Sequence, residues 1–329
     1  MKFFYIFLAI IVIGLLFVYS LFKAPAEFKD DKSFLIEPGQ SAQVVALNLQ
    51  EQGLIKNSLL FRLTAKYKGA EKNLVSGEHQ LSAGSGILAI ISQLQNKDNL
   101  SSELTITIPE GWRMYQIAEH LENKGIAAIA EFNQVAKIEN WREQYDFLAD
   151  KSIKSLEGYL FPDTYRIFSD AKPEDVIKRM LDNFSLKLDD KLRADIAKSG
   201  KSLHEIIILA SIIEHEAKFD ADRYLVAGVF YNRLEIGMAL QSCATINYLT
   251  NKNAARVSGE DLEIDSPYNT YKYPGLPPGP IANPGLESIK SAIYPQSGNY
   301  FYFLNDSRGK AYFAETYEKH QANIRKYLD

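Results

Sequence analysis

The N-terminal segment places the strongest constraint on this chain. Phe3–Phe22 is a run of twenty uncharged residues, most of them apolar, flanked by Lys2 and Lys23. A helix rises 1.5 Å per residue, so this run matches a hydrocarbon core of ~30 Å. The alternative is a cleaved signal peptide ending at Ala24-Pro25-Ala26, but apolar regions of signal peptides span only about 7–15 residues. We predict an uncleaved transmembrane anchor at residues 1–22, with the rest of the chain outside the cytoplasm.

Length and composition describe the remainder. The chain has 329 residues, which predicts about two domains of roughly 150 residues each. Hydrophobic residues make up 46% and charged residues 24%, which is typical of globular proteins and excludes disorder of the whole chain. The net charge of −4 argues against nucleic acid as a partner. The single cysteine, Cys243, can form neither an intramolecular disulfide nor a thiolate metal site.

An internal repeat follows a short polar linker at residues 23–33. Six pairs of similar or identical residues are each separated by 72 positions: Ile36 and Ile108, Gly39 and Gly111, Val45 and Ile117, Ala46 and Ala118, Leu49 and Leu121, Gly53 and Gly125. Each copy begins with an apolar run, continues with a Pro/Gly turn, and then shows apolar residues at helical spacing. The glycine that closes each copy is typical of a helix C-terminus. The repeat therefore predicts a strand–turn–helix unit that is used twice.

These patterns predict an α+β chain. Residues 34–152, which contain the repeat, form a small α/β module, either a binding module or a spacer that holds the next domain away from the membrane. Residues 153–329 form a second domain with helical patterns at 173–187 and from Leu203, and an aromatic strand at 299–306. We expect this domain to be mostly helical with a small β element.

The segment from Leu203 to Ala217 is the most informative for chemistry. Ser202 and Glu205 form a capping box that fixes the start of a helix. Apolar residues cover almost every direction around the axis, which predicts a buried helix.

This helix nevertheless carries Glu214 and Glu216, which lie about 200° apart around its axis. Burial raises the pKa of a carboxyl group, and a glutamate becomes a general acid near neutral pH in this way. The alternative is that both glutamates pair with Lys218 or Arg223 near the end of the helix.

Other reaction types find little support in the sequence. His215-Glu216 lacks the second histidine of an H-E-x-x-H zinc site, so we expect no metal. Cys243 has no recognisable nucleophile context. The Gly/Pro-rich stretch at 274–285 contains too many prolines to offer the row of N–H donors that binds phosphate, and no other phosphate-binding glycine loop is recognisable.

Four stretches together resemble a known family. They are EGYLFPDTY at 157–165, ASIIEHEA at 210–217, VFYNRLEIGMALQ at 229–241 and SPYNTYKYPGLPPGPIANPG at 266–285. With the single N-terminal anchor, they make the chain similar to the YceG-like family of endolytic murein transglycosylases. The resemblance covers essentially the whole chain.

The resemblance implies a LysM-like module after the anchor and a catalytic domain that cuts peptidoglycan glycan strands without a cofactor. The catalytic residue of the family is the second glutamate of the E-x-E pair, which is Glu216 here. The implied reaction cleaves the β-1,4 bond between N-acetylmuramic acid and N-acetylglucosamine and leaves 1,6-anhydro ends. The implied location is the inner membrane, with the catalytic domain in the periplasm, where the enzyme terminates or trims nascent strands beside peptidoglycan synthases.

The remaining site predictions are finer. We predict that Gln241, Asn269 and Tyr271 form hydrogen bonds to the substrate; the alternative is that they have structural roles. Candidate supporting residues are Glu157, Asp163 and Glu214. The chain departs from the family at Cys243-Ala244, where Asp-Pro is usual, and at Ala217, where Thr is common, so the loop at 243 is expected to be looser. The alternative function is a non-catalytic, membrane-anchored scaffold that binds peptidoglycan.

Overall fold

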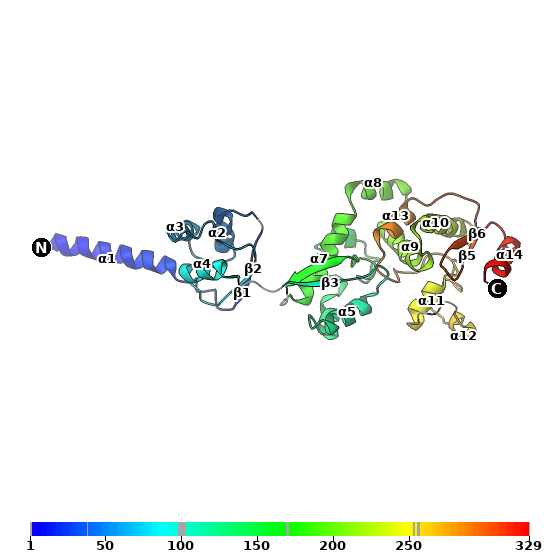
Figure 1. Ribbon diagram of the computed structural model, residues 1–329, viewed down its shortest axis with the longest axis horizontal. Helices are drawn as coiled ribbons and strands as arrows, with labels where there is room; N and C mark the ends of the chain where they lie inside the picture. Colours follow the sequence, from blue (N-terminus) through cyan, green and yellow to red (C-terminus); the bar gives the residue numbers. More distant parts are fainter. Residues whose placement is uncertain are drawn as a thin grey trace. The chain divides into compact units, whose positions relative to one another are not determined.

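The computed structural model describes residues 2–37, 39–97, 103–168, 171–252, 254 and 257–328. The chain divides into two compact units: Met1–Leu104 with Phe168–Asp170, and Thr105–Ile167 with Ala171–Asp329. Helices dominate both units, and the strands in the described ranges pair two by two: β1 with β2, β3 with β4, and β5 with β6 (Figure 1). The predicted α+β class is confirmed.

The first unit contains one long helix and a small α/β module. Its elements are α1 (Lys2–Phe22), β1 (Lys32–Ile36), α2 (Ala42–Glu51), α3 (Ser58–Tyr67), β2 (Gly77–Leu81) and α4 (Ile87–Gln95). Strands β1 and β2 are antiparallel, with Phe34 opposite His79. The buried faces of α2, α3 and α4 close over Phe34 and Ile36, and these side chains form a core of their own.

The N-terminal helix is continuous from Lys2 to Phe22. Within the residues that the structure describes, no helix meets the length and apolarity needed to span a membrane.

Both copies of the sequence repeat form the predicted strand–turn–helix unit. Helix α2 follows β1, and α5 (Met114–Asn123) follows β3 (Glu103–Thr107). Val45, Ala46 and Leu49 on α2 are fully buried, as are their counterparts one repeat later on α5: Ile117, Ala118 and Leu121. Gly53 and Gly125 have φ of 68° and 69° and follow the ends of these helices. In both copies the glycine N–H bonds to the carbonyl three residues before it, and the next N–H bonds to the carbonyl five residues before its own position.

The two copies belong to different units, which departs from the predicted module at 34–152. Ile108, Ile117 and Leu121 of the second copy share one core with Leu156 and Ile207 of the following domain. The boundary between the units therefore lies at residues 104 and 105 rather than at 152 and 153. A local repeat pattern cannot reveal this, because it does not specify which distant surface covers each apolar face.

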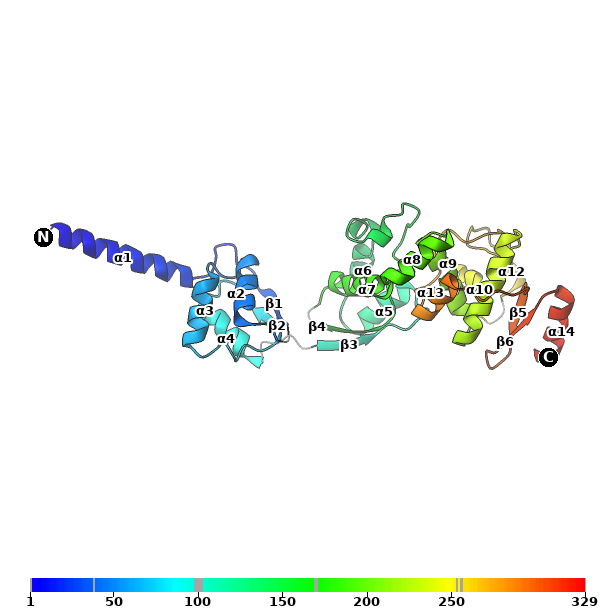
Figure 2. The ribbon, with the colours of Figure 1, turned by 90° about the horizontal axis from the view of Figure 1, so that it is seen from above.

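The second unit is mostly helical. After β3 and α5 its elements are α6 (Ile129–Val135), the 3-10 helices η2 (Ile138–Asn140) and η3 (Asp146–Leu148), β4 (Thr164–Phe168), α7 (Pro173–Lys187), α8 (Asp190–Ser199), α9 (Leu203–Glu216), α10 (Asp220–Glu235), α11 (Cys243–Thr250), α12 (Gly259–Leu262), α13 (Leu286–Ile293), β5 (Tyr302–Asn305), β6 (Ala311–Ala314) and α14 (Tyr317–Tyr327). Helices α10, α11 and α13 pack against α9 (Figure 1), and α14 contacts both strands of the antiparallel pair β5–β6 (Figure 2). Helix α9 is therefore the central element of this unit.

Candidate active site

Helix α9 forms as its sequence predicts. The Ser202 hydroxyl accepts a hydrogen bond from the Glu205 N–H at 3.1 Å, and the Glu205 carboxylate accepts one from the Ser202 N–H at 2.7 Å. Every residue from Ile206 to Ile213 is buried, so the helix is anchored in the core along its length. Its C-terminal end is thereby held in place, and it presents Glu214 and Glu216.

Glu214 forms a structural ion pair. Its Oε1 accepts a hydrogen bond from Arg223 Nη2 at 3.0 Å, and its Oε2 accepts one from the Gly285 N–H at 2.9 Å. The side chain is only 7% exposed. Glu214 therefore joins the end of α9 to α10 and to the start of α13, and the pairing with Arg223 that the sequence left open holds for this glutamate.

Glu216 faces a different element. The Ser242 hydroxyl, at the start of α11, donates a hydrogen bond to its Oε1. Burial raises the pKa of Glu216 above its ordinary value, and this effect outweighs the hydrogen bonds from Ser242 and the Ala244 N–H and the charge of Arg233, all of which lower it. The backbone is fixed as well, because Asn305 Nδ2 donates to the Glu216 carbonyl at 2.7 Å. A partly buried carboxyl group with a raised pKa can donate a proton.

Ser242 is held by a strained turn. Gln241, the residue before it, has φ of 51°, in the left-handed region that non-glycine residues seldom occupy. The N–H of Gln241 donates to the Thr270 carbonyl at 2.9 Å, and the N–H of Ser242 donates to Thr270 Oγ1 at 3.1 Å. The Ser242 hydroxyl also accepts from the Ala244 N–H, which caps α11. One hydroxyl thus caps a helix and contacts the candidate acid.

Arg233 is a second neighbour that sequence reasoning missed. Its guanidinium is buried, donates to the Phe301 carbonyl at 2.7 Å, and lies 5.6 Å from the centre of the Tyr302 ring. Its charge lowers the pKa of Glu216, so it favours the carboxylate form of this side chain.

Sequence reasoning also missed Ser242. It ends the stretch Leu240-Gln241-Ser242, directly before Cys243-Ala244, where the chain departs from the family, and this position is the signal that could have drawn attention to it.

The predicted substrate-binding residues have different environments. Gln241 is exposed beside Ser242. The Tyr271 hydroxyl lies 3.1 Å from Cys243 Sγ, and burial raises its pKa. Asn269 is fully buried, and its amide contacts four backbone groups, those of Leu262, Ile264, Tyr271 and Lys272. Asn269 therefore fixes its own loop, and its amide has no group left to offer a ligand. The structure also caps α11 at Ser242 with Cys243-Ala244 in place, so this departure does not remove the start of the helix.

Two predicted supporting carboxyl groups also have structural contacts. Glu157 accepts hydrogen bonds from the Met114 N–H at 3.0 Å and from Asn283 Nδ2 at 3.1 Å, and burial raises its pKa to about 8. Asp163 accepts from Asn183 Nδ2 at 3.0 Å. Burial alone would raise the pKa of Asp163, but its hydrogen bonds and the charge of Lys187 hold it below the ordinary value. Asn283, the other partner of Glu157, was not singled out from the sequence.

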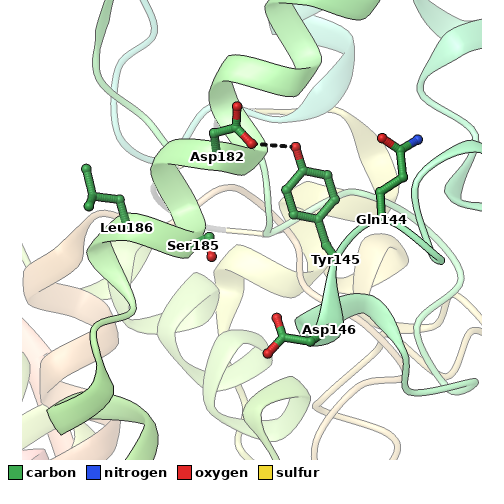
Figure 3. A pocket seen from close by; sticks show the side chains of 6 residues that line it. All are labelled: Gln144, Tyr145, Asp146, Asp182, Ser185 and Leu186. Atoms are coloured by element: carbon green, nitrogen blue, oxygen red, sulfur yellow. Dashed lines mark hydrogen bonds between the residues drawn. The ribbon is translucent and has the colours of Figure 1, made fainter.

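One hollow lies away from Glu216 in the same unit. A cavity of about 580 Å³ is lined by Gln144, Tyr145, Asp146, Asp182, Ser185 and Leu186 (Figure 3). The Tyr145 hydroxyl donates to Asp182 at 2.7 Å, and Arg193 pairs with Asp146 at 2.9 Å, so the tyrosine and both carboxylates of this cavity already have partners within the protein. Across the described ranges, no cluster of three or more His, Cys, Asp and Glu side chains is placed to hold a metal ion.

Fold and site together define an α+β protein with a candidate proton donor at the end of a buried helix. The model of the YceG-like family matches residues 34–326, and the chain belongs to this family. The resemblance found in the sequence is confirmed.

Individual relatives agree with this assignment. The endolytic murein transglycosylase of Bacillus subtilis (strain 168) is 35% identical over 332 residues, covering 97% of this chain and 91% of the relative. The endolytic murein transglycosylase of Streptococcus pneumoniae serotype 2 is 32% identical over 360 residues, covering 99% of this chain and 64% of the relative. A crystal structure of a YceG-like protein from Listeria monocytogenes matches with a TM-score of 0.62 and 33% identity, covering 89% of this chain and 99% of that one.

Proposed function

We propose that the protein is an endolytic lytic transglycosylase, a carbon–oxygen lyase that cleaves the β-1,4 bond between N-acetylmuramic acid and N-acetylglucosamine in peptidoglycan. The observation that carries the proposal is Glu216: its pKa is raised by burial, its hydrogen-bond donor is a neutral hydroxyl, and it ends the central helix. Support comes from two relatives at 32% and 35% identity that bear the name endolytic murein transglycosylase.

In the proposed reaction one carboxyl group acts twice. Protonated Glu216 donates its proton to the glycosidic oxygen, the bond from C1 of N-acetylmuramic acid to that oxygen breaks, and the oxygen stays on C4 of N-acetylglucosamine as a hydroxyl. The 6-hydroxyl of the same N-acetylmuramic acid bonds to C1, and the Glu216 carboxylate accepts its proton. Glycosidases usually need a second carboxyl group to act as nucleophile or to activate water. Here the neighbouring Glu214 is paired with Arg223, and the intramolecular attack needs no water.

The reaction products test this proposal directly. Digestion of purified glycan strands should give 1,6-anhydro-N-acetylmuramic ends, which are lighter than hydrolysed ends by one water. Mass spectrometry distinguishes the two. Reducing ends would identify a hydrolase, and strands that are bound but left uncut would identify a peptidoglycan-binding scaffold.

Ser242 sets the protonation of Glu216 in this proposal. Its hydrogen bond lowers the pKa of Glu216, so Ser242→Ala should raise that pKa. The acid must be protonated to act, so kcat/KM falls as pH rises through the pKa of Glu216. The alkaline limb of the profile should therefore move to higher pH in Ser242→Ala. The maximal rate should fall about tenfold or more, because the variant lacks the hydrogen bond to the Glu216 carboxylate and one hydrogen bond to a charged group contributes about 1.5–3 kcal/mol.

The control is Ser242→Thr, which keeps a hydroxyl and can still cap α11. It should retain the wild-type alkaline limb. An unchanged limb in Ser242→Ala would show that Ser242 does not act on the acid.

We also propose that α1 is an uncleaved anchor in the inner membrane and that the residues after it are periplasmic. The support is the uncharged run Phe3–Phe22 within one continuous helix. N-terminal sequencing of the membrane-bound protein should return the intact N-terminus. A mature chain that begins near Glu27 would exclude the anchor.

The sequence predicts a LysM-like role, to bind or position glycan, for residues 34–152. We propose this role for the part of that range in the first unit, up to residue 104, whose described residues up to 97 have a core of their own. A fragment of residues 23–104 should sediment with purified sacculi more than a control protein does; equal sedimentation would leave the spacer role. Glycan binding by the part of the first unit that follows the proposed anchor would suit an enzyme that terminates or trims nascent strands beside peptidoglycan synthases.

A further inference from the structure

A second hollow adjoins the end of α9. It has a volume of about 490 Å³ and lies between the start of α10 and the turn that joins β5 to β6; its lining residues are Phe219, Asp222, Asp306, Arg308, Lys310 and Tyr312. Phe219 follows Glu216 by three residues. Asn305, which donates to the Glu216 carbonyl, directly precedes Asp306. The hollow is therefore built from the same two segments that fix the backbone of the candidate acid.

The two carboxylates of this hollow shape the turn. Asp306 Oδ1 accepts hydrogen bonds from the Arg308 N–H at 2.9 Å and the Lys310 N–H at 3.0 Å, and these bonds hold its pKa below the ordinary value. Asp222 Oδ2 accepts from the Ala311 N–H at 3.2 Å. Both carboxylates are thus bound to backbone groups of the turn.

Arg308 and Lys310, the two cations that line the hollow, are both exposed. Within the described residues, no hydrogen bond or ion pair engages the Arg308 guanidinium, but its charge helps to lower the pKa of Asp306. The Lys310 ammonium lies 5.4 Å from the centre of the Tyr312 ring. Lys218, at the edge, donates to the Arg308 carbonyl at 3.4 Å and lies 5.8 Å from the centre of the Phe219 ring. The Phe219 side chain is 46% exposed. Together with Lys218, the hollow therefore has three cations against two carboxylates, beside an exposed aromatic face.

We propose that this hollow binds a carboxylate of the peptide stem on the glycan strand, next to the bond that is cleaved. The proposal rests on the proposed function and names a further part of its substrate. The sugar rings of the strand carry hydroxyl and acetamido groups, which are uncharged, and the lactyl carboxyl of N-acetylmuramic acid is in amide linkage to the stem. The anionic groups of the polymer are then the free carboxylates of the stem. A guanidinium binds a carboxylate through two parallel hydrogen bonds, and Phe219 packs against the aliphatic part of the stem.

The test is a binding measurement with two substrates. Soluble glycan strands with intact stems, and the same strands after an amidase has removed the stems, are titrated against the detergent-solubilised full chain carrying Glu216→Gln, which prevents turnover. The full chain should bind the strands with stems several-fold more tightly, and this preference should shrink as salt is added. In the same background, Arg308→Gln with Lys310→Gln should weaken binding of strands with stems about three- to tenfold and leave binding of bare strands unchanged.

The matched control is Lys124→Gln with Lys151→Gln, which removes the same charge at exposed positions outside the hollow and should change neither affinity. The proposal is overturned if Arg308→Gln with Lys310→Gln keeps full affinity for strands with stems, or loses the same factor on both kinds of strand. Cleavage by the wild-type chain, measured on both strands in parallel, tests the proposed function separately. An inactive wild-type chain that still prefers stems would refute the function and keep the subsite.

Discussion

Glu216→Gln should lower the rate of glycan cleavage by about 10²–10⁴-fold, the usual contribution of a positioned general acid or base. The amide keeps the shape of the side chain and can still accept the hydrogen bond from Ser242, but it has no proton to give. The substitution also removes a carboxyl group whose ionisation burial opposes. The variant should therefore stay folded, with a melting temperature at or above that of the wild type at alkaline pH.

Glu214→Gln is the control, because it makes the same chemical change two residues away. It weakens the ion pair with Arg223, which keeps a second partner in Asp220 at 2.9 Å. We expect a loss of stability of about 2 kcal/mol and a cleavage rate within about tenfold of the wild type. The measurements are the release of anhydro ends and thermal unfolding. A Glu216→Gln enzyme that retains a tenth of the wild-type rate would contradict the assignment of the acid.

Local signals explain which features the sequence could predict. The capping box at Ser202, the all-round apolar pattern of α9 and the glycines that end the repeat helices act within a few residues, so they can be identified without a fold. The opposite directions of Glu214 and Glu216 follow from helix geometry alone, and the structure gives them separate partners, Arg223 and Ser242.

Long-range contacts explain what the sequence could not predict. Ser242 approaches Glu216 from 26 positions away, through a turn in which Gln241 adopts a left-handed conformation that no local rule assigns to it. Asn269 looked like a polar contact for a ligand, but the folded loop surrounds its amide with backbone groups. The second repeat copy was assigned to the first module because its apolar face does not reveal which core it joins.

The buried amide of Asn283 shows how such long-range contacts support the site. Its Oδ1 accepts hydrogen bonds from the N–H groups of Gly158 at 2.9 Å and Leu160 at 3.0 Å, while its Nδ2 donates to the Trp112 carbonyl at 2.9 Å and to Glu157 at 3.1 Å. Four groups from two distant segments thus meet on one side chain. Gly158 also needs to be glycine: it has φ of 92°, and a Cβ there would lie 2.6 Å from the Pro280 ring.

Asn283→Ala should therefore destabilise the protein by about 3–5 kcal/mol, a value that only a few substitutions reach. Alanine makes none of the four hydrogen bonds: it leaves the N–H groups of Gly158 and Leu160 buried without this acceptor, and it removes one of the donors to the Trp112 carbonyl and to Glu157. Thermal or urea unfolding of the second unit measures the loss, and the melting temperature should fall by roughly 10 °C. Asn73→Ala is the control, because Asn73 is exposed and donates one hydrogen bond, to the Gly69 carbonyl at 3.2 Å; it should lose less than about 0.5 kcal/mol. A loss below about 1 kcal/mol in Asn283→Ala would mean that water replaces the amide and that the loop at 157–160 is not held by this side chain.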